Sequence, residues 1–121
     1  MYFIQDSQET YNEYKKKIQG EIFAISSEYG LDSNDFIKTF LGSKYAESMD
    51  RSDGSRFWLM SPKYTIGCFL DDYNTKKGKH YRKDEMEWLG EKYREIALKS
   101  TSKEALKKDP SKLLENYKLY L

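Results

Sequence analysis

Apolar residues recur every three or four positions along much of the chain, which is the spacing that gathers side chains on one face of an α-helix. The first such stretch contains Tyr11, Tyr14, Ile18, Ile22, Ile25 and Tyr29, with charged residues between them. It follows two N-cap candidates, Asp6 and Ser7, and ends before Gly30, a residue suited to a left-handed C-terminal cap. The pattern predicts an amphipathic helix of about 22 residues.

Capping residues mark two of the next three predicted helices. Asp32 or Ser33 can cap a helix that carries Phe36, Phe40 and Leu41, and a further helical piece runs from Ser43 to Met49. Ser61 followed by Pro62 is typical of a helix start, because proline at the first position loses no hydrogen bond. Apolar residues at helical spacing then predict a helix from Pro62 to Tyr73. An alternative makes residues 65–70 a strand paired with residues 57–60.

The second half of the chain predicts three more helical segments. Asp84 and Glu87 have the spacing of a capping box, and the inner face that follows contains Met86, Leu89, Tyr93, Ile96 and Ala97. Ser102 can cap a short turn, and Asp109 with Pro110 begins a last helix with Leu113, Leu114, Tyr117 and Leu121 inward. The fold class predicted is all-α: a compact single-domain bundle of six to seven short helices over residues 1–121. One short extended segment near residues 57–60 remains an alternative to a helix anchor.

Composition restricts the function without naming it. The 121 residues carry a net charge of +1, and 16% of them are aromatic, which indicates a folded domain rather than a disordered chain. One cysteine excludes an internal disulfide, and one cysteine with one histidine excludes a zinc site of thiolates and imidazoles. Cys68 and His80 have no third residue to orient them as a nucleophile and its base. We therefore expect no enzyme activity, no cofactor and no metal.

Neither a signal peptide nor a membrane span is visible in the sequence. The N-terminus lacks a basic segment followed by an apolar run. The longest apolar stretches are about four residues, against the roughly 20 that span a bilayer. We expect a cytoplasmic protein with no membrane partner.

One stretch of the chain, residues 74–83, concentrates positive charge. Its five cations, with no acid among them, are Lys76, Lys77, Lys79, Arg82 and Lys83. The stretch is either a solvated loop or a small basic patch that contacts phosphate or an acidic partner. The preceding acids, Asp71 and Asp72, lie at a helix C-terminus, where the dipole disfavours them, so they are candidates for pairing with this loop.

Aromatic residues give a second candidate surface. Trp58, Trp88 and Tyr81 are the residues that could form an aromatic interface or stack on single strands. The alternative is that they belong to an aromatic core. Trp88 lies one position off the inner face of its helix, where it would face a neighbouring helix.

Two long stretches, Glu28–Tyr73 and Glu87–Tyr120, cover about two-thirds of the chain and share a pattern of residues with a known family. The positions that match this pattern are Phe36, Phe40, Ser43, Ala46, Ser61, Trp88, Tyr93 and Tyr117. On these positions the chain resembles a family of small, uncharacterised helical proteins of Firmicutes. The chain departs from that pattern at Pro62, where the family has glycine, at the charged residues Glu91, Lys92 and Arg94, and at Leu121 in place of a histidine.

The resemblance implies a genomic neighbourhood rather than a chemistry. Such proteins tend to be encoded beside ADP-ribosyltransferase-like toxin modules, in toxin–antitoxin or mobile-element loci. It therefore implies a helical fold and a protein partner, such as a toxin, and it transfers no catalytic residue.

Three function classes follow from these observations. The first is a non-enzymatic, antitoxin-like module that binds or masks a partner protein. The second is a phage or mobile-element inhibitor of a host defence system, similar to an anti-CRISPR protein. The third is a nucleic-acid-binding accessory protein that contacts phosphates through the basic stretch 76–83.

Overall fold

Seven helices and no strand make up the part of the chain that the structure, a computed structural model, describes, residues 3–51 and 61–119. Side chains are described from residue 11 onward. The helices are α1 (Phe3–Glu28), α2 (Ser33–Leu41), α3 (Lys44–Asp50), α4 (Pro62–Asp72), α5 (Lys83–Lys99), α6 (Ser102–Ala105) and α7 (Pro110–Lys118). The prediction of an all-α bundle is confirmed, although α1 is long rather than short. No described helix has the length and apolar character needed to cross a bilayer.

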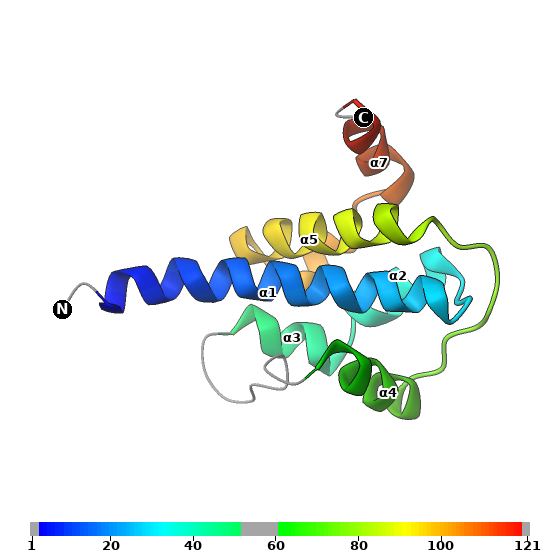
Figure 1. Cartoon of the computed structure of the whole chain (residues 1–121), viewed down its shortest axis with the longest axis horizontal. Coiled ribbons are helices and arrows are strands. Elements are labelled where there is room, and N and C mark those ends of the chain that lie inside the picture. The colour runs from blue at the N-terminus through cyan, green and yellow to red at the C-terminus, as the bar shows by residue number, and fades with distance from the viewer. Residues whose placement is uncertain (1–2, 52–60, 120–121) are drawn as a thin grey trace.

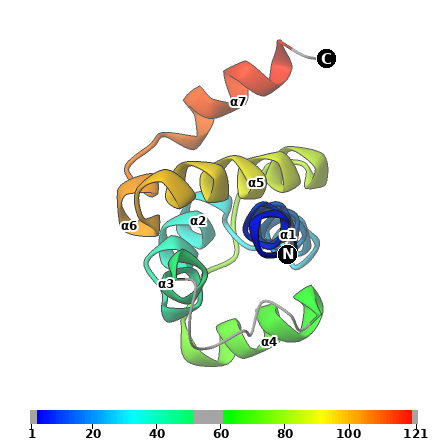
Figure 2. The same ribbon diagram turned by 90° about the vertical axis from the view of Figure 1, so that its left-hand side faces the viewer.

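Helix α1 is the axis of the bundle (Figure 1). Helix α5 runs along one side of it and α4 lies on the opposite side, while α2, α3 and α6 form a group beside these three (Figure 2). Helix α7 lies on the outer side of α5, away from α1 (Figure 2). The α4–α5 connection passes the turn between α1 and α2 at one end of the bundle (Figure 1).

Two glycines let α1 and α5 approach closely. A Cβ atom on Gly90 would lie 2.6 Å from the carbonyl oxygen of Gln19 and 2.7 Å from the Cα of Gly20. A Cβ atom on Gly20 would lie 2.9 Å from the carbonyl oxygen of Glu87. All three distances are too short for a side chain, so glycine is required on both helices at this crossing. This packing explains why α1 contains a residue of low helix propensity.

Phenyl rings from three helices fill the centre of the bundle. Phe23 of α1 contacts Phe36 and Phe40 of α2 edge-on, with ring centroids 5.3 and 5.7 Å apart. Phe69 of α4 approaches Phe36 to 5.4 Å in the same manner. All four side chains are fully buried. Edge-to-face pairs of this kind stabilise a core beyond the area they bury.

Most of the predicted helix starts are confirmed. The side chains of Asp32, Ser43, Ser61 and Asp109 each accept a hydrogen bond from a backbone N–H in the first turn of the helix that follows. The strand alternative for residues 65–70 is wrong, because these residues belong to α4. The extended-segment alternative for residues 57–60 lies outside the described residues.

Three predicted helix starts are wrong. Helix α1 begins at Phe3, before the predicted caps Asp6 and Ser7. Helix α5 is capped two residues earlier than predicted, at Arg82, whose backbone N–H donates to Glu85 over 3.0 Å. Helix α6 follows Thr101, which accepts a hydrogen bond from the N–H of Glu104, rather than Ser102. Near the starts of α5 and α6, more than one hydroxyl or carboxylate could serve as the cap, so the sequence pattern alone does not select the true one.

The predicted inner face of α1 is partly wrong. Ile18 and Ile22 are buried, but Tyr11, Tyr14 and Tyr29 are 39, 37 and 42% exposed. The face that packs on the bundle also runs through Lys15, Gln19, Phe23 and Ser26, which are spaced for a helix and buried. Polar residues therefore occupy part of the buried face of α1. An inner face predicted from apolar residues alone is rotated about the helix axis relative to the true buried face.

Candidate interaction surface

The basic stretch lies in the α4–α5 connection and is not a free loop. It runs antiparallel to the α1–α2 turn, with an isolated β-bridge between Leu31 and Lys77. The N–H of Asp32 donates to the carbonyl of Lys76 over 2.9 Å, and the N–H of Gly78 donates to Gly30 over 3.2 Å. These bonds hold the backbone of the connection in one place.

Side chains of the α1–α2 region add further anchors. The N–H of Lys76 donates to Asp35 Oδ2 over 3.0 Å, and the N–H of Tyr81 donates to Ser33 Oγ over 2.8 Å. Ser27 Oγ donates to the carbonyl of Tyr81 over 2.7 Å. Satisfying backbone groups in this way fixes the direction in which each residue of the connection leaves the surface.

Three of the five predicted cations point into solvent from this fixed backbone. Lys76, Lys77 and Lys79 are exposed, and none of them has a carboxylate at ion-pair distance within residues 11–51 and 61–119. We call this group the lysine platform. Its ammonium groups are available to a partner without first breaking an internal ion pair.

The other two cations are engaged elsewhere. Arg82 contacts both carboxylate oxygens of Asp84, at 3.0 and 3.1 Å, and Lys83 contacts Glu28 at 3.1 Å. Both cations stand at the N-terminus of α5, where the helix dipole disfavours positive charge. The acids beside them offset this, so the predicted five-residue patch is reduced to the lysine platform.

Asp72 does not pair with the basic stretch, contrary to expectation. Its Oδ2 accepts a hydrogen bond of 2.6 Å from the Tyr45 hydroxyl and lies 3.1 Å from Lys44 Nζ. The hydrogen bond from Tyr45, followed by that from Lys44, lowers the pKa of Asp72. The carboxylate is thus directed toward α3 and not toward the basic stretch.

The structure describes two residues of the predicted aromatic interface, Tyr81 and Trp88. Tyr81 packs against the core, and burial raises the pKa of its hydroxyl. Trp88 contacts Tyr117 of α7 with ring centroids 5.2 Å apart, and Lys92 Nζ lies 5.9 Å from its centroid. The prediction that Trp88 faces a neighbouring helix is confirmed. Trp58 lies outside the described residues.

A surface hollow lies beside the lysine platform. It has a volume of about 450 Å³ and is lined by Tyr29, Leu31, Leu70, Tyr73, Asn74, Thr75 and Lys77. The helical spacing of apolar residues places Tyr29 and Tyr73 on inner helix faces, so it does not predict that they line a surface hollow. The exposure of Tyr29 could have been predicted from the sequence. The residue before a C-terminal glycine cap lies at the end of its helix, where fewer neighbouring residues cover it.

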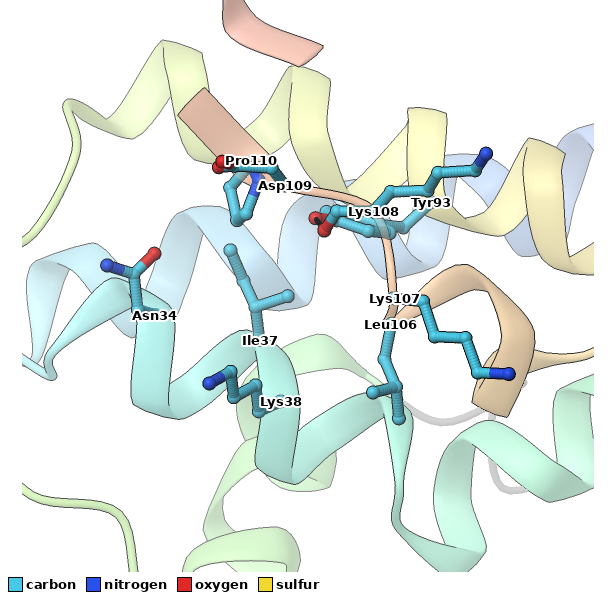
Figure 3. Close-up of a pocket in the computed structure, with 9 residues that line it drawn as sticks. All are labelled: Asn34, Ile37, Lys38, Tyr93, Leu106, Lys107, Lys108, Asp109 and Pro110. Carbon is cyan, nitrogen blue, oxygen red and sulfur yellow. Dashed lines mark hydrogen bonds between the residues drawn. The ribbon is translucent and has the colours of Figure 1, made fainter. Parts of the chain in front are cut away.

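A second hollow, of about 310 Å³, lies between α2, α5 and the α6–α7 connection. Ile37, Leu106 and Tyr93 surround it, while the ammonium groups of Lys38 and Lys107 point in opposite directions (Figure 3). Lys107 is paired with Glu104 at 2.6 Å. The lysines around this hollow therefore do not converge on a common ligand.

A buried polar cluster that the sequence analysis missed lies where α1, α3, α5 and α6 meet. Arg94 is fully buried, and its guanidinium donates to Asp50 over 2.7 Å, to Gln19 over 3.0 Å and to Ser102 over 3.0 Å. Asp50 also accepts from the N–H of Ser102 over 2.9 Å. The partners come from segments far apart in sequence, so no local pattern could identify them.

Cys68 and His80, the two residues considered for nucleophilic chemistry, lie in different surroundings. Cys68 packs against the core, while His80 is exposed with its ring 3.3 Å from the carbonyl of Gly78. No group of three metal-ligating side chains occurs among the residues that could be searched, those with a described placement. Comparison of the chain with protein-family models, curated proteins and solved structures finds no match in any of the three.

Proposed function

We propose that this protein is a non-enzymatic binding module whose lysine platform docks on an acidic surface of a partner protein. The observation that carries the proposal is the contrast within one loop: its backbone is hydrogen-bonded to the α1–α2 turn, while its three lysines form no ion pair with any side chain that the structure describes. Because this loop is already ordered, little conformational entropy is lost when a partner binds to it. The antitoxin-like character rests on the family resemblance and makes the partner a toxin from the same locus.

The charges around the platform favour a protein over a nucleic acid. Asp32 and Asp35 lie beside the lysines, because their carboxylates cap α2 and hold the N–H of Lys76. A continuous phosphate backbone would meet these carboxylates as well as the ammonium groups, and like charges repel. An acidic protein surface can place separate carboxylates against the lysines and leave Asp32 and Asp35 in solvent.

The test is co-expression with the protein encoded by the neighbouring gene, followed by size-exclusion chromatography and titration calorimetry. We expect one co-eluting complex. Replacing Lys76, Lys77 and Lys79 together by glutamate should weaken it by about tenfold or more, since charge reversal at the interface adds repulsion. The far-ultraviolet circular dichroism of the variant should match that of the original chain.

A matched control carries the same change in net charge elsewhere. Lys63, Lys103 and Lys112 are exposed residues in the first turns of α4, α6 and α7, where glutamate suits the helix dipole. Their triple glutamate variant should bind as the original chain does. Separate elution of two folded proteins would overturn the proposal, and so would equal losses in both variants.

Nucleic acid binding has its own signature in the same variants. Three phosphate contacts predict a slope near −2.7 for the logarithm of the affinity for duplex DNA against the logarithm of salt concentration. A labelled duplex that binds with such a slope, and is released by the platform variant alone, would replace the protein partner with a nucleic acid.

A further inference from the structure

The hollow beside the lysine platform is lined by both apolar and polar side chains. Tyrosine rings and leucine side chains make its apolar part, and Asn74 and Lys77 place polar groups at it. Volumes of a few hundred Å³ are typical of small binding pockets, and about 450 Å³ has room for a large side chain. The hollow and the platform share Lys77, so a ligand of one can reach the other.

The tyrosine on the α4 side is held rigidly. The ring of Tyr73 stacks on Phe69, with centroids 5.2 Å apart and an interplanar angle of 22°. Its hydroxyl oxygen accepts a hydrogen bond of 3.0 Å from the N–H of Lys44. One wall of the hollow is therefore preorganised by the core and by the start of α3.

The tyrosine on the α1 side is placed by the end of its helix. Gly30 has a φ of 70°, and the N–H groups of Gly30 and Leu31 donate to Ser27 and Ser26, the two bonds of a Schellman motif. Tyr29 precedes this turn and is 42% exposed. The bridge between Leu31 and Lys77 then fixes the lysine across from the same turn.

The hollow also borders a polar atom without a partner. The hydroxyl oxygen of Thr75 is buried and has no hydrogen-bond partner among the described residues. An unsatisfied polar group of this kind is costly in a folded protein and is uncommon outside functional sites.

We infer that the hollow receives an aromatic side chain from an acidic segment of the partner, whose carboxylates lie on Lys76, Lys77 and Lys79. This inference rests on the proposed function and adds the residue type that anchors the partner. An aromatic side chain offers its face or edge to the rings of Tyr29 and Tyr73, and aromatic residues are the ones that most often anchor interfaces. The lysines supply charge complementarity around the anchor.

Fluorescence anisotropy with two labelled peptides tests the inference on the full chain. The first peptide has three glutamates on either side of one phenylalanine, and the second has alanine in place of the phenylalanine. We expect the phenylalanine peptide to bind about tenfold more tightly, because it buries an aromatic side chain. Tyr29→Ala should remove that difference and leave the affinity for the alanine peptide unchanged.

Tyr64→Ala is the matched control, since Tyr64 is 59% exposed on α4 and does not line the hollow. It should leave both affinities unchanged. Equal binding of the two peptides, lost in the platform triple variant, would overturn the aromatic anchor and leave the proposed acidic partner standing. Binding of neither peptide would overturn both.

A labelled oligothymidylate completes the design. If it binds more tightly than the phenylalanine peptide, and if Tyr29→Ala weakens it, the tyrosines stack on nucleobases and the occupant is a single strand rather than a protein segment. That outcome would overturn the inference.

Discussion

The Arg94 cluster and the lysine platform both depend on positive charge, and they use it in opposite ways. Arg94 is fully buried, and its donors reach Asp50, Gln19 and Ser102. In the lysine platform the backbone is hydrogen-bonded to the α1–α2 turn, while the ammonium groups remain in solvent. The difference shows which charges this chain uses for its own fold and which it leaves for a partner.

The difference also explains why the two regions tolerate change unequally. A buried charge that loses its partner keeps its desolvation cost, whereas an exposed lysine loses only a weak, screened interaction. Substitutions in the Arg94 cluster should therefore change the free energy of unfolding. Substitutions in the lysine platform should change the affinity for a partner and leave the free energy of unfolding nearly unchanged.

The largest effect is expected from Arg94→Met. The variant leaves the Asp50 carboxylate without its cation, and it should lower the free energy of unfolding by about 3–5 kcal/mol. Urea denaturation followed by circular dichroism measures the change. If the variant does not fold, Arg94→Lys, which keeps the charge and loses the branched donor geometry, should give a smaller loss.

Lys99→Met is the control for this variant, since Lys99 is exposed on the same helix. Its effect should stay within about 0.5 kcal/mol, as is usual at the surface. A loss below 1 kcal/mol in Arg94→Met would contradict the view that the cluster supports the fold, because removing one partner of a buried pair is normally far more costly.

The next effect in size is expected from Gly90→Ala. The added methyl group would lie 2.6 Å from a backbone oxygen of α1, so the two helices must move apart, at a cost of about 1–3 kcal/mol. Gly67→Ala is the matched control, because Gly67 is exposed within α4 and has nothing within 4 Å of the added atom. It should stabilise the protein by up to about 1 kcal/mol through helix propensity. Two losses of equal size would argue against close packing at Gly90.

Sequence reasoning predicted the local features of the fold well. The caps at Asp32, Ser61 and Asp109 depend on a side chain and a backbone group a few residues apart, so the sequence contains the whole interaction. The glycine cap at Gly30 is of the same kind. Short-range chemistry of this type needs no knowledge of the tertiary structure.

Features that depend on tertiary contact were missed or misplaced. The partners of Arg94 lie up to 75 residues away, so the arginine looks like a surface residue in the sequence. The hollow joins the end of α1 to the end of α4, and the two tyrosines that line it looked like core residues. The basic stretch was recognised, but the carboxylates that engage Arg82 and Lys83 could be separated from the free lysines only in three dimensions.

A smaller effect is expected from Gly78→Ala, which tests the rigid backbone of the platform. A Cβ atom there would lie 2.7 Å from Asp32 Oδ2, so the carboxylate that caps α2 must shift. Loss of a cap costs about 1 kcal/mol, which predicts roughly fivefold faster hydrogen exchange at the N–H groups of Asp32 and Ser33. Unchanged exchange would show that the connection does not depend on this contact. The N–H groups of α5 serve as the internal reference.

The smallest effect concerns Asp84, which pairs with Arg82 and accepts a hydrogen bond from Tyr117 of α7, and it follows from the pH dependence of this carboxylate. Hydrogen bonds from Arg82 and then from Tyr117 lower the pKa of Asp84 to about 2, from an ordinary value of 3.8. Because the folded state holds the deprotonated form, the stabilisation is complete above about pH 4 and is lost as the pH falls toward 2. The urea midpoint of the original chain should therefore exceed that of Asp84→Asn at pH 6, and the difference should shrink between pH 4 and pH 2.

The dependence of the urea midpoint on pH is measured for both proteins, and the Asp84→Asn values are subtracted from those of the original chain. The subtraction removes the effect of the other carboxylates, which titrate in the same pH range. The difference should also diminish in concentrated salt, since Asp84 and Arg82 are exposed and their attraction is screened. Tyr117→Phe should narrow the pH window, because it removes one of the two donors that lower the pKa. A midpoint difference equal at pH 2 and pH 6 would mean that Asp84 acts through packing and not through its charge. The Arg94 cluster, buried and internally paired, should show no comparable sensitivity to salt, and this contrast separates charges that hold the core from charges that hold only the surface.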